Sequence, residues 1–270
     1  MKENGSQATP NPPSAPATTG YFLVNGLNLY YEIHGTGQPL VLLHGGICTI
    51  EITFEAVLST LAQSWQVIAI EQQGHGHTAD LDRPLNFPQM ADDTADLLRH
   101  LGIEQAHFLG HSDGGNVGLG VAIRHPDLVQ KLVVVGTNYN KEGLVPEVLE
   151  SFKTVNPEDP DFSRLKESYQ NVAPRPEDWP RLVEKVFQLA LAFPGWSPED
   201  LKALKAPTLI LIGDADVILP EHAVDLFRLI PQSKLAILPG ADHSLTVKRA
   251  DWLLALLADF LQTPSPTVSA

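Results

Sequence analysis

The ten residues AHFLGHSDGG, at positions 106–115, carry the strongest structural signal in the chain. AHFLG has the continuous apolar character of a buried strand, and a helical pattern follows it as far as Arg124. Between them Gly110, Ser112 and Gly114 form the pattern G-x-S-x-G. At a junction of strand and helix, this pattern places the serine on a sharp turn, and glycines stand where larger neighbours would crowd it. We therefore predict that Ser112 is a nucleophile.

Both flanks of this stretch alternate strand and helix patterns. The expected strands are 39–46, 65–71, 106–110, 131–136, 206–213 and 234–240, and the expected helices are 54–63, 88–101, 114–124, 221–229 and 246–261. Strands that are apolar at every residue, separated by helices, indicate an α/β fold with a mostly parallel sheet covered on both faces. Residues 21–33, around Asn25-Gly26, add an antiparallel hairpin at one edge. Ligands bind such sheets beyond the C-terminal ends of the strands.

Residues 138–200 interrupt the alternation. They hold eight of the 22 prolines, and a structureless loop of this length is uncommon in a compact domain. We expect a small helical insertion that caps the pocket; a solvated linker with one helix is the alternative. The expected organisation is a core of 21–137 and 201–263, the cap at 138–200, and loose tails at 1–20 and 264–270.

Composition excludes several classes of function. The net charge of −14 argues against a nucleic-acid partner, because phosphate backbones need clustered positive charge. A single cysteine excludes an intramolecular disulfide and a cysteine-built metal site, and no apolar run reaches the roughly 20 residues that span a bilayer. Residues 1–20 lack the apolar stretch of a signal peptide, which favours the cytoplasm and leaves a processed secreted form open. Oligomeric state is not indicated.

A serine nucleophile needs a base, and the base needs an orienting acid. His243 follows the last expected strand and precedes the final helix, so we expect it to be the base; His222 and His125, in a helix and at a helix end, fit less well. The acid should follow the strand that ends at Gly213. We expect Asp216 in that role, whereas Asp214 suits a turn.

The oxyanion of the reaction needs two backbone N–H donors, each worth roughly 3–4 kcal/mol. The residue after the nucleophile, Asp113, should supply one, and the loop after strand 39–46 the other, with Gly46 first and Ile47 second. Asp113 is also a rival nucleophile. A turn centred on it would put His111 where a tiny residue is needed, which favours Ser112.

Two other features have simpler explanations than a functional site. The run HGHTAD at 75–80 is similar to an H-x-H-x-D-H zinc site, but its aspartate comes one residue late and Leu81 replaces the last histidine. A glycine-rich turn explains it better, so we expect no metal. Cys48 is expected to be a small buried residue.

From Tyr21 to about Leu261, the chain resembles the serine hydrolases of the α/β-hydrolase fold. HGG, the turn in EQQGHGHT, GHSDGG, GDAD and GADH follow one another in the order of that family. The resemblance implies an eight-stranded sheet, a Ser-His-Asp triad and no cofactor. The acidic Asp113 departs from the apolar or amide residue of many members, and its charge is a reason to doubt anionic substrates.

The expected activity is hydrolysis of small, neutral, largely apolar carboxylic esters through an acyl-enzyme. Candidate pocket residues beneath the insertion are Ile47, Trp179, Phe187 and Trp196. The same triad also serves perhydrolases, C–C hydrolases and amide hydrolases. A non-catalytic receptor for a small ligand and a zinc hydrolase that uses the His75 turn remain further alternatives.

Overall fold

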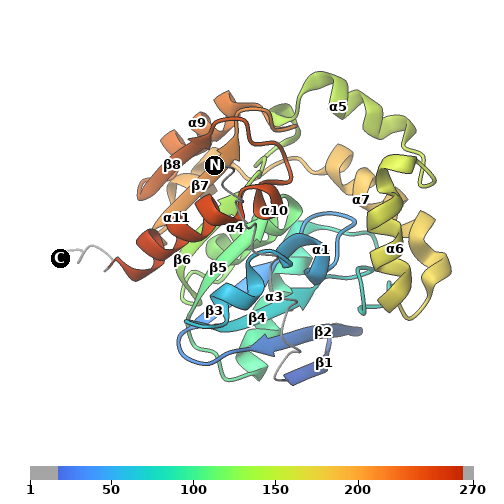
Figure 1. The fold of residues 1–270 in the computed structure, drawn as a ribbon, viewed down its shortest axis with the longest axis horizontal. Coiled ribbons are helices and arrows are strands. Elements are labelled where there is room, and N and C mark those ends of the chain that lie inside the picture. The colour runs from blue at the N-terminus through green and yellow to red at the C-terminus, as the bar shows by residue number, and fades with distance from the viewer. Residues whose placement is uncertain (1–17, 264–270) are drawn as a thin grey trace, which may run out of the picture.

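The computed structural model describes residues 18–263, and eight strands within them form one sheet in the order β1-β2-β4-β3-β5-β6-β7-β8 (Figure 1). The strands are β1 (Thr18–Val24), β2 (Leu27–His34), β3 (Pro39–Leu43), β4 (Gln66–Glu71), β5 (Ala106–His111), β6 (Val129–Val135), β7 (Thr208–Gly213) and β8 (Ser233–Leu238). β2 pairs antiparallel with β1 and β4, and the other neighbouring strands run parallel. The predicted mostly parallel, eight-stranded α/β sheet is confirmed.

Helices cover both faces of the sheet because its strands are apolar on both. Val41 and Leu43 of β3 belong to a core cluster that includes residues of α3 (Phe87–His100), α4 (Asp113–Arg124) and α9 (Pro220–Leu229). Leu40 and Leu42 point the other way, as the period of two requires, into a cluster with α1 (Ile50–Phe54), α2 (Leu58–Leu61) and α11 (Ala250–Gln262).

The parallel register brings the C-terminal ends of the central strands to one edge. Leu43 lies opposite Gly110, and Gly110 lies opposite Val134 on the next strand. The loops that follow β3, β5, β7 and β8 therefore meet at this edge. They carry the glycines at 45–46, then Ser112, Asp216 and His243.

Three α-helices lie wholly within residues 138–200, and they lie together at the upper right of Figure 1. These are α5 (Pro146–Ser151), α6 (Ser163–Val172) and α7 (Trp179–Ala192), with 3₁₀ turns at Lys141–Gly143, Phe152–Thr154, Pro160–Phe162 and Pro176–Asp178. Leu182, Val183 and Val186 of α7 are buried in the first core cluster. We call α5–α7 with their 3₁₀ turns the cap helices. α8 (Pro198–Lys202) leads back to β7.

Several boundaries differ from the sequence-based expectations. Residues 18–20 belong to β1 rather than to a loose tail, because their backbone pairs with β2. The helix expected at 54–63 is the two short helices α1 and α2, and the last helix is divided at Arg249 into α10 (Leu245–Lys248) and α11. The remaining parts of both predicted tails, 1–17 and 264–270, lie outside the described residues. Within 18–263, no helix is long and apolar enough to cross a membrane.

Candidate active site

Ser112 lies on a strained turn between β5 and α4. Its φ of 52° and ψ of −119° place a non-glycine residue at positive φ, a conformation that costs roughly 1–3 kcal/mol. The flanking glycines are required sterically. A Cβ at Gly110 would lie 2.3 Å from the carbonyl oxygen of Gly114, and one at Gly114 would lie 2.0 Å from that of Leu43. The local sequence thus lets β5 turn directly into α4 with the serine at the apex.

A chain of hydrogen bonds joins Ser112, His243 and Asp216. Nε2 of His243 lies 3.0 Å from Oγ of Ser112, and Nδ1 lies 2.7 Å from Oδ1 of Asp216. The Asp216 carboxylate, whose side chain is 1% exposed, also accepts the N–H of Ile218 at 3.1 Å. These partners assign the imidazole proton to Nδ1 and leave Nε2 free to accept the serine proton.

The rival candidates are engaged elsewhere. Oδ1 of Asp214 accepts the N–H of Gly240 at 2.7 Å, which ties down the turn after β7. His222 accepts the N–H of Tyr139 at 3.1 Å, and His125 contacts Asp92 at 2.8 Å.

The loop after β3 presents one free backbone donor to the site. The N–H of Ile47 is donated to Nε2 of His75 at 3.2 Å, whereas that of Gly46 has no acceptor among the described residues. The N–H of Asp113, at the first position of α4, likewise has none. A Cβ at Gly46 would lie 2.6 Å from Oδ2 of Asp113, so the loop packs closely against the elbow. Of the two donors weighed for this loop, Gly46 is the one whose N–H has no partner among the described residues.

Two buried histidines flank that loop. Nδ1 of His44 donates to the carbonyl oxygen of Gly45 at 2.8 Å, and its Nε2 accepts the N–H of Gln72 at 3.0 Å. Burial lowers the pKa of His44 to about 3 and that of His75 to about 4, so both rings are neutral at pH 7. The sequence predicts a glycine-rich turn at His75, with a zinc site as the alternative, and nothing in its local pattern signals its contact with Ile47, 28 residues away.

His111, within the elbow, is a further residue that motif reasoning left without a role. Its Nε2 donates to the backbone carbonyl of His243 at 2.9 Å. Burial lowers the pKa of His111 to about 4, and the ring stays neutral. The elbow and the loop that carries His243 are therefore joined by two contacts, one through Ser112 and one through His111.

Asp113 lines the cavity beside Ser112, and its carboxyl group lies against Gly46. Burial raises the pKa of Asp113 to about 6, while the nearby His243 acts in the opposite direction. Cys48 is half-buried on the same cavity wall, and burial raises the pKa of its thiol to about 12. At pH 7 the Cys48 thiol is therefore protonated, whereas the Asp113 carboxyl is mostly ionised and places a negative charge beside the serine.

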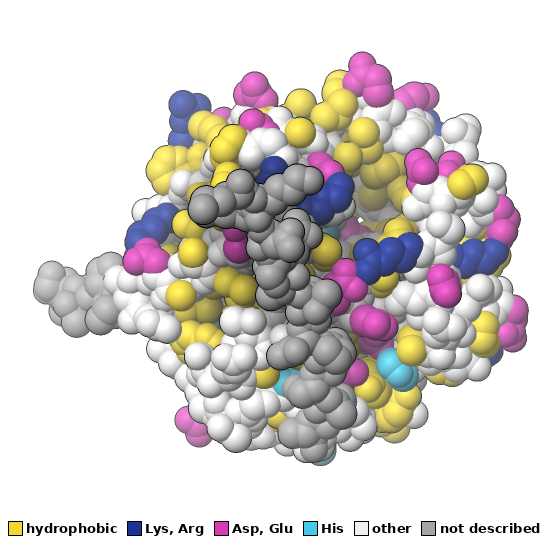
Figure 2. Space-filling view, viewed as in Figure 1, with side chains coloured by type: hydrophobic (Ala, Val, Ile, Leu, Met, Phe, Trp, Pro, Cys, Tyr) yellow, Lys and Arg dark blue, Asp and Glu magenta, His cyan; other side chains and the backbone are white. Residues whose placement is uncertain are grey.

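A cavity of about 500 Å³ lies between the strand ends and the cap helices. Ile47 and Phe187 line it, together with the aromatic rings of Phe152 and Phe193 and with Leu165. Figure 2 shows a hollow in this face with apolar side chains inside it and basic ones near its edge. The basic side chains that line the cavity are Lys141, Arg164 and Lys248.

Trp179 and Trp196 do not line this cavity. Trp179 is fully buried within the cap and donates its indole N–H to the carbonyl oxygen of Pro157 at 2.8 Å. It is eight residues from Phe187 on α7, a separation that turns the two side chains about 80° apart. Trp196 donates to Oδ1 of Asn116 at 3.2 Å and lines a second cavity, which shares Phe193 with the first.

The polar side chains of the turn at 75–80 contact different partners. Nδ1 of His75 donates to the carbonyl oxygen of Gln73 at 3.0 Å, and His77 contacts Glu71 at 2.8 Å. In the described part of the chain, no group of three or more His, Cys, Asp or Glu residues is arranged to hold a metal ion.

Comparison with known proteins agrees with this architecture. The chain is 28% identical to the serine hydrolase BPHL of Mus musculus, over 91% of this chain and 87% of that one. It is 27% identical to the 2-hydroxymuconate semialdehyde hydrolase of a Pseudomonas species, over 93% and 96%. The solved 2-hydroxy-6-oxo-6-phenylhexa-2,4-dienoate hydrolase of a Rhodococcus species superposes with a TM-score of 0.75 at 21% identity, over 91% and 99%. Residues 40–256 match the sequence model of the alpha/beta hydrolase family, and the chain belongs to that family of hydrolases.

Proposed function

We propose that the protein hydrolyses carboxylic esters through a covalent acyl-enzyme on Ser112. The observation that carries the proposal is the hydrogen-bond chain from Ser112 through His243 to the buried Asp216, which opens into a largely apolar cavity. A nucleophile, a base and an orienting acid in mutual contact are what acyl transfer from a neutral substrate requires.

In the acylation step, Oγ of Ser112 bonds to the ester carbonyl carbon as Nε2 of His243 takes the hydroxyl proton. The N–H groups of Gly46 and Asp113 hold the oxygen that becomes negative. When the tetrahedral species collapses, the bond to the alcohol oxygen breaks, and His243 gives the alcohol its proton.

Deacylation repeats these steps with water. His243 removes a proton from the attacking water, the acyl–oxygen bond to Ser112 breaks, and the proton returns to the serine oxygen. Asp216 keeps the imidazole in its Nδ1–H tautomer throughout and stabilises the imidazolium formed in each half-reaction. No step needs a metal or a cofactor.

The cavity supports a small substrate with an apolar acyl or alcohol group. Its volume of about 500 Å³ lies within the usual 300–1,000 Å³ of small-molecule sites. Phe152 and Phe187, whose ring centroids lie 4.7 Å apart, form an apolar wall opposite the serine loop. The Asp113 carboxyl beside Ser112 disfavours a negative charge close to the scissile bond.

The test is turnover of p-nitrophenyl esters from acetate to octanoate, with fluorophosphonate labelling of the active serine. Wild-type protein should turn over the shorter esters, and Ser112→Ala should lose both turnover and labelling. Tight ester binding without turnover in well-folded wild-type protein would instead indicate a receptor and contradict the proposal.

Hydrolysis of a carbon–carbon bond is the second candidate. It is favoured by the similarity to 2-hydroxymuconate semialdehyde hydrolase along nearly the whole chain and by the basic side chains that line the cavity. Arg164 is already paired with Glu55 at 2.6 Å and Lys248 with Asp242, which weakens their pull on a substrate carboxylate. Turnover of 2-hydroxymuconate semialdehyde faster than of every ester would favour this candidate.

A further inference from the structure

His75 is a buried residue that joins the oxyanion loop, residues 45–47, to the loop at 72–83. Its side chain accepts the N–H of Ile47 through Nε2, at 3.2 Å, and donates through Nδ1 to the carbonyl oxygen of Gln73, at 3.0 Å. The residue is 3% exposed, and its ring is neutral at pH 7. Only a neutral ring carries an acceptor on Nε2, so the contact with Ile47 persists under working conditions.

The contact with Ile47 bears on the geometry of the oxyanion donor. Ile47 has a φ of 50°, and a β-branched residue at positive φ is a genuine outlier that its surroundings must hold in place. Its N–H belongs to the planar peptide group that starts at the carbonyl of Gly46. Fixing that plane fixes one side of Gly46, and His44 fixes the other through the carbonyl of Gly45. The N–H of Gly46, which has no acceptor among the described residues, then has little freedom to turn.

The partner of His75 is held in turn by its own loop. The amide nitrogen of Gln73 donates to Oδ1 of Asp80 at 2.9 Å and to the carbonyl of Arg83 at 3.2 Å. Nε of Arg83 donates back to the amide oxygen of Gln73. The position of Gln73 therefore depends on where Asp80 lies.

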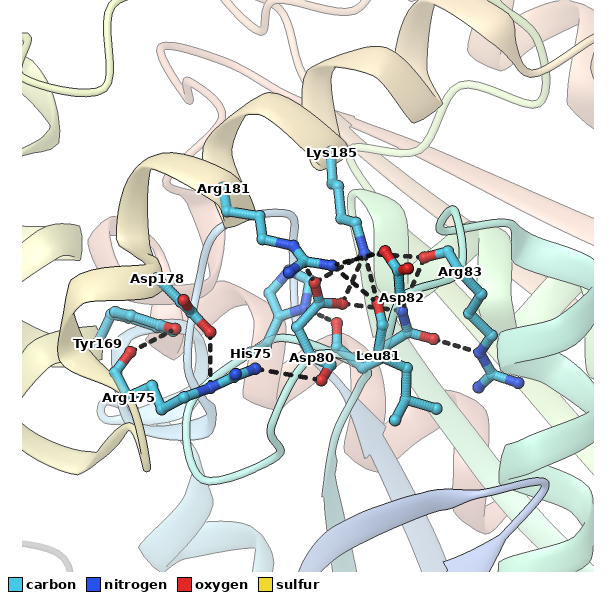
Figure 3. A network of polar contacts seen from close by, with 11 residues as sticks. His75, Asp80, Leu81, Asp82, Arg83, Tyr169, Arg175, Asp178, Arg181 and Lys185 are labelled. Carbon is cyan, nitrogen blue, oxygen red and sulfur yellow. Dashed lines mark hydrogen bonds and ion pairs between the residues drawn. The ribbon is translucent and has the colours of Figure 1, made fainter.

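Asp80 is the point at which the cap helices are attached to this loop. Its side chain is 6% exposed and receives Lys185 at 2.7 Å and Arg181 at 2.8 Å, both from α7 (Figure 3). Lys185 also donates to the carbonyl oxygens of Leu81 and Arg83, at 2.7 and 2.8 Å. A mostly buried carboxylate needs these cations, since without them its charge is left uncompensated.

We propose that His75 is a positioning residue for the oxyanion hole, and that helix α7 sets its position through the contacts of Lys185 and Arg181 with Asp80 and of Asp80 with Gln73. This inference rests on the proposed function. In the closed arrangement, Lys185 and Arg181 hold Asp80 in place, and Asp80 holds the loop at 72–83. That loop positions His75, and His75 positions the peptide plane between Gly46 and Ile47. When α7 moves away, Asp80 loses both cations and the oxyanion loop loses its support. Closure of the cap helices and alignment of the Gly46 N–H therefore take place together.

The first test compares His75→Leu with His75→Gln, using p-nitrophenyl acetate and a trifluoromethyl ketone that forms a tetrahedral adduct. Leucine removes the acceptor for Ile47, whereas the amide oxygen of glutamine replaces it. His75→Leu should lower kcat by about 10- to 100-fold with KM within about 3-fold of wild type, and should weaken ketone binding by a similar factor. His75→Gln should recover most of both losses.

Rates are expressed per serine labelled by the fluorophosphonate. A purely structural role would lower the labelled fraction and the melting temperature but leave kcat per labelled site unchanged, and that outcome would overturn the proposal. Failure of His75→Gln to recover ketone binding would also overturn it.

The second test uses Lys185→Met, which removes the contact of Lys185 with Asp80 from the cap side and leaves the core intact. Its matched control is Lys166→Met, because Lys166 pairs with Glu158 at 2.6 Å inside the cap and touches neither the loop at 72–83 nor the cavity. Lys185→Met should lower kcat for the acetate ester and ketone affinity by about 10-fold, and Lys166→Met should change neither.

A double-mutant cycle tests the coupling. If Lys185 acts through His75, Lys185→Met combined with His75→Leu should lose no more activity than His75→Leu alone, whereas additive losses would show independent action and overturn the coupling. Wild-type protein that turns over esters beside a His75→Leu variant of unchanged kcat would overturn this inference alone. Wild-type protein without turnover or labelling would overturn the proposed function and the inference together.

Discussion

Replacing Asp216 by asparagine should isolate what the buried charge contributes to catalysis. Oδ1 of Asp216 accepts both Nδ1–H of His243 and the N–H of Ile218, so the asparagine oxygen can keep both bonds and the histidine tautomer. The loss is then mainly the attraction between the carboxylate and the imidazolium. For charge centres about 4 Å apart at an effective dielectric constant near 20, that attraction is about 4 kcal/mol, which corresponds to about a 10³-fold decrease in kcat.

The assay is steady-state hydrolysis of p-nitrophenyl acetate at pH 7.5, expressed per fluorophosphonate-labelled site, with circular dichroism to confirm folding. Asp214→Asn is the control, because Asp214 contacts Gly240 rather than His243 and asparagine can still accept that N–H. It should change kcat by less than about 3-fold, as surface substitutions away from the chemistry do. The reasoning is refuted if Asp216→Asn stays within 10-fold of wild type or if Asp214→Asn loses as much.

Three further predictions concern pH and stability. Burial raises the pKa of Asp113 to about 6 from 3.8, so the unfolded chain releases this proton first as the pH rises, and the free energy of unfolding falls between pH 4 and pH 6. Asp113→Asn should therefore stabilise the protein by up to about 3 kcal/mol at pH 8 and hardly at all at pH 3.5. Urea titrations at both pH values measure this difference. Gly114→Ala would place a Cβ 2.0 Å from a backbone oxygen and should lower the free energy of unfolding by more than about 3 kcal/mol. Gly102 has open space around it at a φ of 72°, so Gly102→Ala should lower the free energy of unfolding by only about 1 kcal/mol. Equal melting temperatures of the two variants would contradict this prediction. Lys131 donates to the carbonyls of Phe260 and Leu261 at the end of α11, at 2.7 and 3.0 Å, so Lys131→Met should lower the free energy of unfolding by about 2–3 kcal/mol in urea titrations while kcat stays unchanged.

The response of activity to salt depends on how exposed each ion pair is. The side chains of Lys185 and Asp80 are 15% and 6% exposed, so moderate salt screens this pair little, whereas Arg181 is 41% exposed and its pair with Asp80 is screened more. Salt-dependent activity in wild-type protein would therefore arise at the more exposed pairs, such as Arg164 with Glu55 and Arg181 with Asp80, rather than at Lys185 with Asp80.

The elbow and the sheet could be predicted from the sequence because their causes are local. Glycines at 110 and 114 flank the serine within five residues, and the steric need for them is met inside one strand, one turn and the start of one helix. Continuous apolar strands separated by helices lead to a parallel sheet whatever the details of the loops. The positions of Asp216 and His243 after β7 and β8 follow from the same alternation.

Contacts between distant segments depend on the tertiary structure alone. Which aromatic residues of α7 face the cavity depends on how that helix docks on the core, and for this reason Phe187 lines the cavity while Trp179 is buried inside the cap. His75 holds the backbone of Ile47, and Lys185 holds Asp80 from 105 residues away. A hydrogen bond to a backbone group leaves no pattern in the residue that it contacts, since every non-proline residue offers the same N–H. The candidate nucleophile Ser112 is therefore predicted from ten consecutive residues, whereas the contacts that support it form only once the chain has folded.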